Sequence, residues 1–241
     1  MLYYPVMNFR LSWTWKERTA IASLAFLCLS CLSENSGSTL DIFPLSVGNT
    51  WKFVDSTLYG SDSVHVDSSQ LTITGTKTVK IEGKDQTVYI GSWTYGVSTM
   101  PSPLKAYYLS ENHSLYNCGA EQDTAHIAEK IVHLQYPTQK GAVYPTHFYN
   151  FASVNGVERF DLDTIQVQVL SADTVWNGPA GIFSAVIYQG SRISDGWSAK
   201  TYYAPGIGSL GYLIKSTRDN KGMPQIVVSK RVLKSYSLHA D

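Results

Sequence analysis

The chain has 241 residues, of which 44% are hydrophobic and only 16% are charged, so it can bury one sizeable core as a single domain. Lysine plus arginine and aspartate plus glutamate both number 19, which gives a formal charge of zero. Nucleic-acid binding is therefore not expected, because no excess of basic residues is present to neutralise phosphates.

Residues 1–31 have the three-part layout of a secretory signal peptide. Arg10, Lys16 and Arg18 precede an apolar run at residues 19–29, which ends in the small residues Ser30 and Cys31. The run is shorter than the roughly 20 apolar residues that a membrane-spanning helix needs. We therefore expect an exported protein that starts at Met1 or Met7.

Ser30 and Cys31 resemble the lipobox of bacterial lipoproteins, in which the cysteine becomes the lipid-modified first residue of the mature chain. Cys28 and Leu29 depart from that family, which prefers Leu and a smaller residue at these positions. The resemblance implies lipidation of Cys31 and an outer-membrane anchor; the alternative is cleavage after Ser33, which gives a soluble periplasmic or secreted protein. Residues 32–41 are polar and predict a flexible tether.

Residues 42–237 predict an antiparallel β domain, because apolar and polar residues alternate through most of this stretch. The clearest hairpins are predicted at residues 69–93, around the turn 82–85, and at residues 164–188, around the turn 177–181. About ten to twelve strands with short turns and no alternation with helices favour a single curved sheet, half-barrel or barrel-like. The alternative is a β-sandwich.

One short helix is predicted at residues 122–134. Asp123 would cap it, and Ile127, Ile131 and Leu134 would share one face. His126 and His133 would lie two turns apart, a spacing that does not match the usual metal-binding pair, so no metal site is expected. Residues 130–135 also fit a strand.

The stretch at residues 202–212 contains Gly206, Gly208 and Gly211 in the spacing of the dinucleotide-binding fingerprint. That fingerprint requires a helix after the glycines, whereas the residues after Gly211 predict a strand. Pro205, Gly206 and Gly208 are therefore interpreted as turn residues. Neither a nucleotide nor another cofactor is expected.

No catalytic motif stands out, so a non-enzymatic protein is expected. Cys118 would be the one thiol of a mature chain lipidated at Cys31, and a small buried side chain is favoured there. Asp161 and Asp163 could share a strand face as a carboxylate pair, but no further catalytic partner is evident. The aromatic residues Trp93, Trp197, Tyr202 and Tyr203 are candidate ligand-binding residues; core packing is the alternative.

Three short segments together resemble a loose group of bacterial envelope lipoproteins of unknown function. They are Phe43-Pro44-Leu45 with Gly48-Asn49 and Trp51, then residues 179–183, and finally residues 202–208. After Gly208 this chain continues Ser-Leu-Gly-Tyr, where that group often continues Leu-Val-Lys. The group is similar in architecture to the outer-membrane proteins that carry or receive lipoproteins, which implies a half-barrel with an apolar interior.

The resulting hypothesis is a non-enzymatic envelope lipoprotein. It would be structural or would bind an apolar, lipid-like ligand in a concave β-sheet, with the membrane as its partner through the lipid anchor. The alternative is a carbohydrate- or surface-binding module with exposed aromatic rings, and a hydrolase is less favoured.

Overall fold

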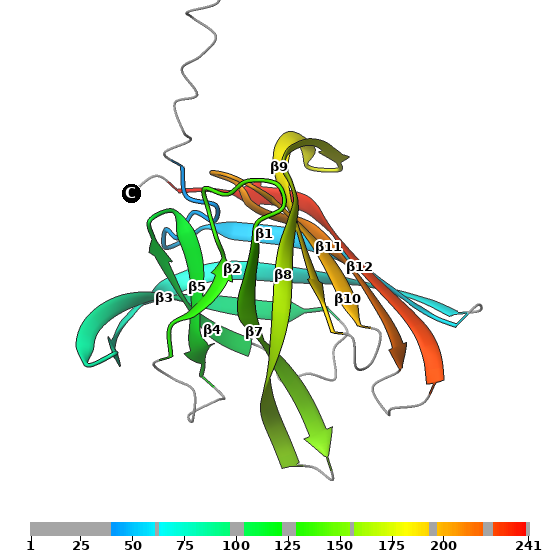
Figure 1. The fold of residues 1–241 in the computed structure, drawn as a ribbon, viewed down its shortest axis with the longest axis horizontal. Helices are drawn as coiled ribbons and strands as arrows, with labels where there is room; N and C mark the ends of the chain where they lie inside the picture. The colour runs from blue at the N-terminus through cyan, green and yellow to red at the C-terminus, as the bar shows by residue number, and fades with distance from the viewer. Residues whose placement is uncertain are drawn as a thin grey trace, which may run out of the picture. The chain divides into compact units, whose positions relative to one another are not determined.

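Twelve β-strands form the part of the chain that the structure describes, a computed structural model covering residues 40–60, 63–96, 104–121, 129–154, 157–192, 197–218 and 224–239 (Figure 1). The strands are β1 (Thr50–Tyr59), β2 (Ser63–Ile81), β3 (Lys84–Tyr95), β4 (Leu104–Glu111), β5 (Ser114–Ala120), β6 (Ile131–Leu134), β7 (Val143–Val154), β8 (Val157–Gly178), β9 (Gly181–Ser191), β10 (Ser198–Ala204), β11 (Gly208–Arg218) and β12 (Pro224–Ser237). Within these residues no helix is long and apolar enough to cross a membrane.

All twelve strands belong to one antiparallel sheet in the order β6-β5-β4-β3-β2-β1-β12-β11-β10-β9-β8-β7. Neighbours in sequence pair throughout except β6 and β7, which are the two edge strands, and β1 pairs with β12 in the middle of the sheet. The sheet curls until its two edge strands, β6 and β7, approach each other, which gives a nearly closed barrel (Figure 1). The predicted single curved antiparallel sheet is confirmed, and the β-sandwich alternative is wrong.

Tight turns with positive φ angles set the register of two neighbouring hairpins. Glu82 and Gly83 join β2 to β3 with φ of 50° and 80°, and Asn112 and His113 join β4 to β5 with φ of 50° and 63°. Two-residue turns of this hand match the right-handed twist of the strands they connect. The hairpin predicted at residues 69–93 is confirmed, because β2 and β3 pair from Ser69–Tyr95 to Ile81–Lys84.

The predicted helix at residues 122–134 is wrong over its last turn, where Ile131–Leu134 form strand β6 paired with β5. In β6, Ile131 and Leu134 are buried while Val132 and His133 are half-buried. This spacing of three between buried residues also fits a helix, but pairing with β5 makes the segment a strand. Residues 122–128, including His126, lie outside the described residues.

The main core fills one end of the barrel with aromatic rings. The segment at residues 40–49, just before β1, folds into this end: Gly206 N donates to the Asp41 carbonyl oxygen and Ile42 N donates to that of His113. Phe43 is thereby placed 4.5 Å from the Trp51 ring, centroid to centroid. The largest fully buried apolar side chains are Trp51, Tyr188, Phe53, Ile42, Ile73, Ile81, Leu210, Leu233, Val88, Val169 and Val186.

A second, smaller core forms where the ends of β2 and β3 pack with β4 and β5. Its buried members are Val79, Ile81, Val88, Tyr107 and Cys118. Cys118 is completely buried, and burial raises the pKa of its thiol to about 11. Such a thiol is inert at neutral pH.

Candidate functional site

The two edge strands of the sheet are joined by side chains rather than by a backbone ladder. Thr146 on β7 donates a hydrogen bond to the Val132 carbonyl oxygen on β6. The Tyr144 hydroxyl lies 3.4 Å from the carbonyl oxygen of His133 and 3.4 Å from the backbone nitrogen of Gln135. We call this line between β6 and β7 the seam; it is the one place where the barrel wall is held without strand pairing in the described sheet.

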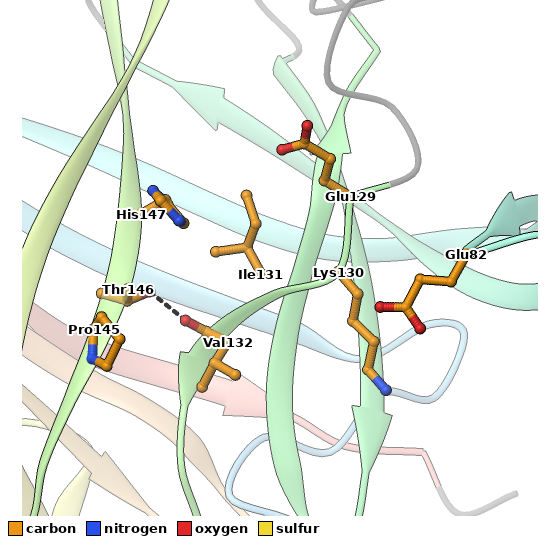
Figure 2. Close-up of a pocket in the computed structure, with 8 residues that line it drawn as sticks. All are labelled: Glu82, Glu129, Lys130, Ile131, Val132, Pro145, Thr146 and His147. Carbon is orange, nitrogen blue, oxygen red and sulfur yellow. Dashed lines mark hydrogen bonds between the residues drawn. The ribbon is translucent and has the colours of Figure 1, made fainter.

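A hollow of about 530 Å³ lies along the seam (Figure 2). Apolar groups of β6 and β7 line part of it, and two carboxylates, Glu82 and Glu129, stand at its other side. The lining residues are Glu82, Glu129, Lys130, Ile131, Val132, Pro145, Thr146 and His147. The hollow therefore combines an apolar wall with charged groups.

Lys130 is already committed to partners outside the hollow. Its ammonium group forms an ion pair with Glu111 and lies 4.5 Å from the centroid of the Tyr116 ring. Burial acts to lower the pKa of Lys130, but the Glu111 carboxylate outweighs it and the pKa is raised. Glu82 also acts to raise the pKa of Lys130, so the ammonium group offsets part of the negative charge that Glu82 and Glu129 give to the hollow.

A metal centre is not formed at the hollow. His147 Nδ1 lies 3.1 Å from Thr164 Oγ1 on the neighbouring strand β8. Across the described ranges, no group of three or more histidine, cysteine, aspartate or glutamate side chains could hold a metal ion. The carboxylates and His147 are therefore too dispersed to act as one ligand set.

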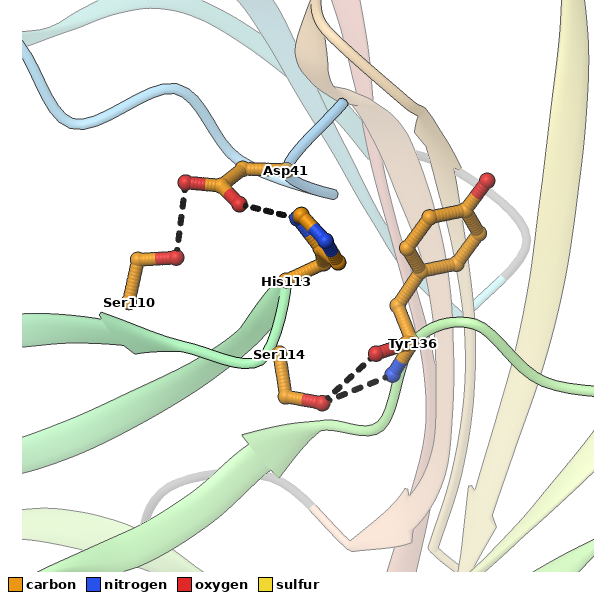
Figure 3. A network of polar contacts seen from close by, with 5 residues as sticks. All are labelled: Asp41, Ser110, His113, Ser114 and Tyr136. Atoms are coloured by element: carbon orange, nitrogen blue, oxygen red, sulfur yellow. Dashed lines mark hydrogen bonds and ion pairs between the residues drawn. The ribbon is translucent and has the colours of Figure 1, made fainter. Parts of the chain in front are cut away.

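Asp41 organises a polar network at the end of the barrel that the segment 40–49 closes (Figure 3). One carboxylate oxygen lies 2.8 Å from His113 Nδ1, and the other accepts a hydrogen bond of 2.8 Å from Ser110. A serine nucleophile would have to donate to the histidine, whereas Ser110 donates to the aspartate. The network ties the segment to the β4–β5 turn and does not have the geometry of a catalytic triad.

In the described part of the chain, the barrel interior holds a largely buried ion pair between Asp55 on β1 and Arg231 on β12, whose side chains are 17% and 11% exposed. Arg231 Nε donates to Asp55 Oδ1 at 2.6 Å, and Ser69 donates to the other carboxylate oxygen at 2.5 Å. The guanidinium carbon lies 4.7 Å from the Trp93 ring centroid and 4.9 Å from that of Tyr212. Burial acts to lower the pKa of Arg231, but Tyr212 and Asp55 outweigh it and raise the pKa, so the arginine stays charged.

The four candidate aromatic residues do not form one exposed surface. Trp93 donates from Nε1 to the Tyr108 hydroxyl at 3.2 Å, and Tyr203 is only 8% exposed inside the main core. Tyr202 is half-buried against the same core. Trp197 is half-buried under the guanidinium of Arg192, 5.5 Å from its ring centroid.

The glycine-rich stretch lies at the β10–β11 hairpin. Pro205 and Gly206 stand between the two strands, and Gly208 begins β11, which continues as a strand to Arg218. Gly206 and Gly208 have φ of +76° and +97°, which favour glycine. The stretch also supports the core, since the Ile207 carbonyl oxygen accepts a hydrogen bond of 2.6 Å from Trp51 Nε1.

Other residues singled out in the sequence lie where the structure gives no contact. Cys31 lies outside the described residues. Asp161 and Asp163 lie on β8, opposite Asn150 and Phe148 in the β7–β8 register, but their side chains are not described.

Sequence reasoning missed the Asp55–Arg231 pair, whose members are 176 positions apart. A signal was present: Asp55 continues the alternation of the buried residues Trp51 and Phe53, and Arg231 that of the buried Leu233. A charged residue at a core-facing position predicts a buried partner, because an unpaired buried charge is costly.

No family model and no curated protein matches the chain. Among solved structures, it is similar to a Bacteroides fragilis protein inferred to be exported and described as having a YmcC-like fold, with 12% identity, 83% of this chain and 100% of that chain covered, and a TM-score of 0.45. It is also similar to a Parabacteroides distasonis protein inferred to be a lipoprotein, with 12% identity, coverage of 82% and 99%, and a TM-score of 0.39. Both similarities are too remote to carry an argument about this chain.

Proposed function

We propose that this chain is a non-enzymatic envelope lipoprotein, anchored through Cys31, whose barrel is a self-supporting domain and not a lipid carrier. The filled barrel end is the observation that supports this proposal. The rings of Phe43, Trp51, Phe53 and Tyr188 are buried there, and those of Phe43 and Trp51 pack with their centroids 4.5 Å apart. Of the two roles weighed from the sequence, a structural core is therefore favoured over an apolar cavity.

The segment at residues 40–49 supports the tethered arrangement. Asn49, fully buried, donates from Nδ2 to the Pro44 carbonyl oxygen at 2.9 Å and accepts from the His239 backbone nitrogen at 2.6 Å. The chain is thereby fixed to the barrel from Asp41 onward, and Asp41 lies only ten positions after Cys31. A tether of that length holds the domain within about 35 Å of the lipid anchor.

Metabolic labelling with an alkyne analogue of palmitate tests the anchor. The wild-type protein and the matched control Cys28→Ala should both incorporate the label and fractionate with membranes. Cys31→Ala should lose the label and become soluble, because the acylated residue is removed. Equal labelling of wild type and Cys31→Ala, or no labelling of either, would reject the lipoprotein assignment.

Binding of a fluorescent fatty acid to the mature domain tests the filled interior. No saturable binding is expected, and no lipid should co-purify in mass spectrometry. A stoichiometric bound lipid would show that the barrel opens and would restore the carrier role.

The carbohydrate-binding alternative depends on exposed rings and is less well supported. Trp93 is held in the core by its bond to Tyr108, and Tyr203 is buried. Quenching of tryptophan fluorescence by iodide should therefore leave most of the emission unaffected.

A further inference from the structure

The outer face of the barrel over β2, β1, β12, β11 and β10 carries apolar side chains in contact with solvent. Val64 and Val66 on β2 are 66% and 61% exposed, and Ile226 on β12 is 64% exposed. The registers place Val64 beside Leu58, and Leu58 beside Val228. We call this surface the basic-apolar face; its apolar members are Val54, Leu58, Val64, Val66, Leu213, Ile226, Val228 and Val232.

The inner face of the same strands is mixed at this level, with polar side chains beside apolar ones such as Val227 and Ile214. Thr57 and Ser229 face each other across β1 and β12 with their hydroxyl oxygens 3.2 Å apart, next to the Asp55–Arg231 pair. The outward apolar side chains of these strands are in contact with water unless another molecule covers them. A contiguous patch of this kind marks an interaction surface.

Lysines are interleaved with the apolar residues on this face. Lys52, Lys200, Lys215 and Lys230 are all exposed and occupy its outward positions on β1, β10, β11 and β12. No aspartate or glutamate occupies an outward position on the described parts of these five strands. The face is therefore strongly basic, although the whole chain has no net charge.

This combination distinguishes between a protein partner and a bilayer. The core of a protein interface is depleted in lysine. A surface that binds membranes instead combines buried apolar area with lysines that meet anionic headgroups.

We propose that the basic-apolar face is a second membrane contact, which docks flat on a bilayer rich in anionic phospholipid. Buried apolar area and electrostatic attraction to anionic lipid each add to membrane attachment. Here the apolar residues insert at the headgroup boundary and the lysines pair with phosphates.

Vesicle co-sedimentation of residues 32–241 tests this contact without the lipid anchor. All described strands and both cores lie within residues 40–239, so this chain retains the whole fold. It should bind vesicles of phosphatidylglycerol and phosphatidylcholine in equal parts, and bind vesicles of phosphatidylcholine alone much more weakly. High salt should weaken the binding.

Two sets of variants separate the face from net charge. The triple variant Lys200→Glu, Lys215→Glu and Lys230→Glu should lose at least about a hundredfold in affinity, at about fivefold per lysine removed. Val64→Ser with Val66→Ser should also weaken binding. The first matched control is Lys84→Glu with Lys140→Glu, which are exposed outside the five strands of the face and are compared with the double variant Lys215→Glu and Lys230→Glu. The second is Val175→Ser with Ile182→Ser, which are 79% and 70% exposed outside the face. Both controls should bind like wild type.

Three outcomes would overturn the proposal. They are equal binding to both vesicle types, equal loss in the face and control variants, and a wild-type dimer in sedimentation velocity that Val64→Ser with Val66→Ser converts to monomer. The last result would assign the face to a second copy of the chain. Because Cys31 is absent from this experiment, its failure leaves the labelling test of the anchor unaffected.

Discussion

Gly208 is the residue at which the turn and the core depend most directly on each other. Its φ is +97°, and a Cβ atom there would lie 2.9 Å from Phe43 Cδ2 and 3.2 Å from Trp51 Nε1. Gly83 has a similar φ of +80° with open space around it. The two glycines therefore separate the effect of backbone strain from that of close packing.

Gly208→Ala should lower the free energy of unfolding by about 2–6 kcal/mol, because strain and overpacking each cost about 1–3 kcal/mol. Gly83→Ala, the matched control, should lose only the strain component. Urea unfolding followed by tryptophan fluorescence measures both. Equal losses in the two variants would show that Phe43 and Trp51 yield to the added methyl group.

Arg231 and Asp55 form a second residue-scale test, because each is the other's charged partner in a site lined by rings. Arg231→Met should cost about 3–5 kcal/mol of stability, since Asp55 then remains buried without its cation. The double variant Arg231→Met with Asp55→Leu should recover most of that loss, because no unpaired charge remains. A double variant as unstable as the single one would mean that the pair itself, and not the isolated carboxylate, determines stability.

At the scale of elements, the sequence predicted those hairpins whose formation depends on residues close together in the chain. The β2–β3 and β8–β9 hairpins follow from local alternation and turn residues, and both are present. For the residues of strand β6, both a helix and a strand were predicted, because the spacing of Ile131 and Leu134 also fits a helical face; the strand alternative is confirmed. Pairing with β5 decides the outcome, and that pairing is set by the geometry of the sheet.

The features of the candidate site are non-local for the same reason. Thr146 meets Val132 across the seam only because the sheet curls fully round. The basic-apolar face likewise requires the β1–β12 register, which joins residues at opposite ends of the chain. Side chains alternate between the two faces of each strand. This alternation does not say which face is inside when charged residues such as Asp55 and Arg231 share a face with aromatic ones.

At the scale of the whole molecule, the strand order makes the seam the natural break in the chain. The backbone ladder is continuous from β6 through β1 and β12 to β7, and it does not cross between β6 and β7 in the described sheet. The connection between β6 and β7 therefore contributes no strand pairing. The chain ends of the barrel lie near each other, since a Cβ on Gly48 would lie 2.9 Å from the His239 ring.

A circular permutant tests this arrangement. Residue 239 would be joined to residue 40 by a flexible glycine-serine linker, and the new ends would be placed between Thr138 and Gln139. This variant should fold with the circular dichroism spectrum of the native domain and a midpoint of thermal unfolding within a few degrees of it, because every ladder is kept and each strand now follows its neighbour in sequence. A control permutant opened between Gly206 and Ile207 should be much less stable, since it breaks the turn that holds Asp41 and Trp51. If the seam permutant fails to fold while the control folds, the β6–β7 connection, and not the β1–β12 pairing, is what closes the barrel.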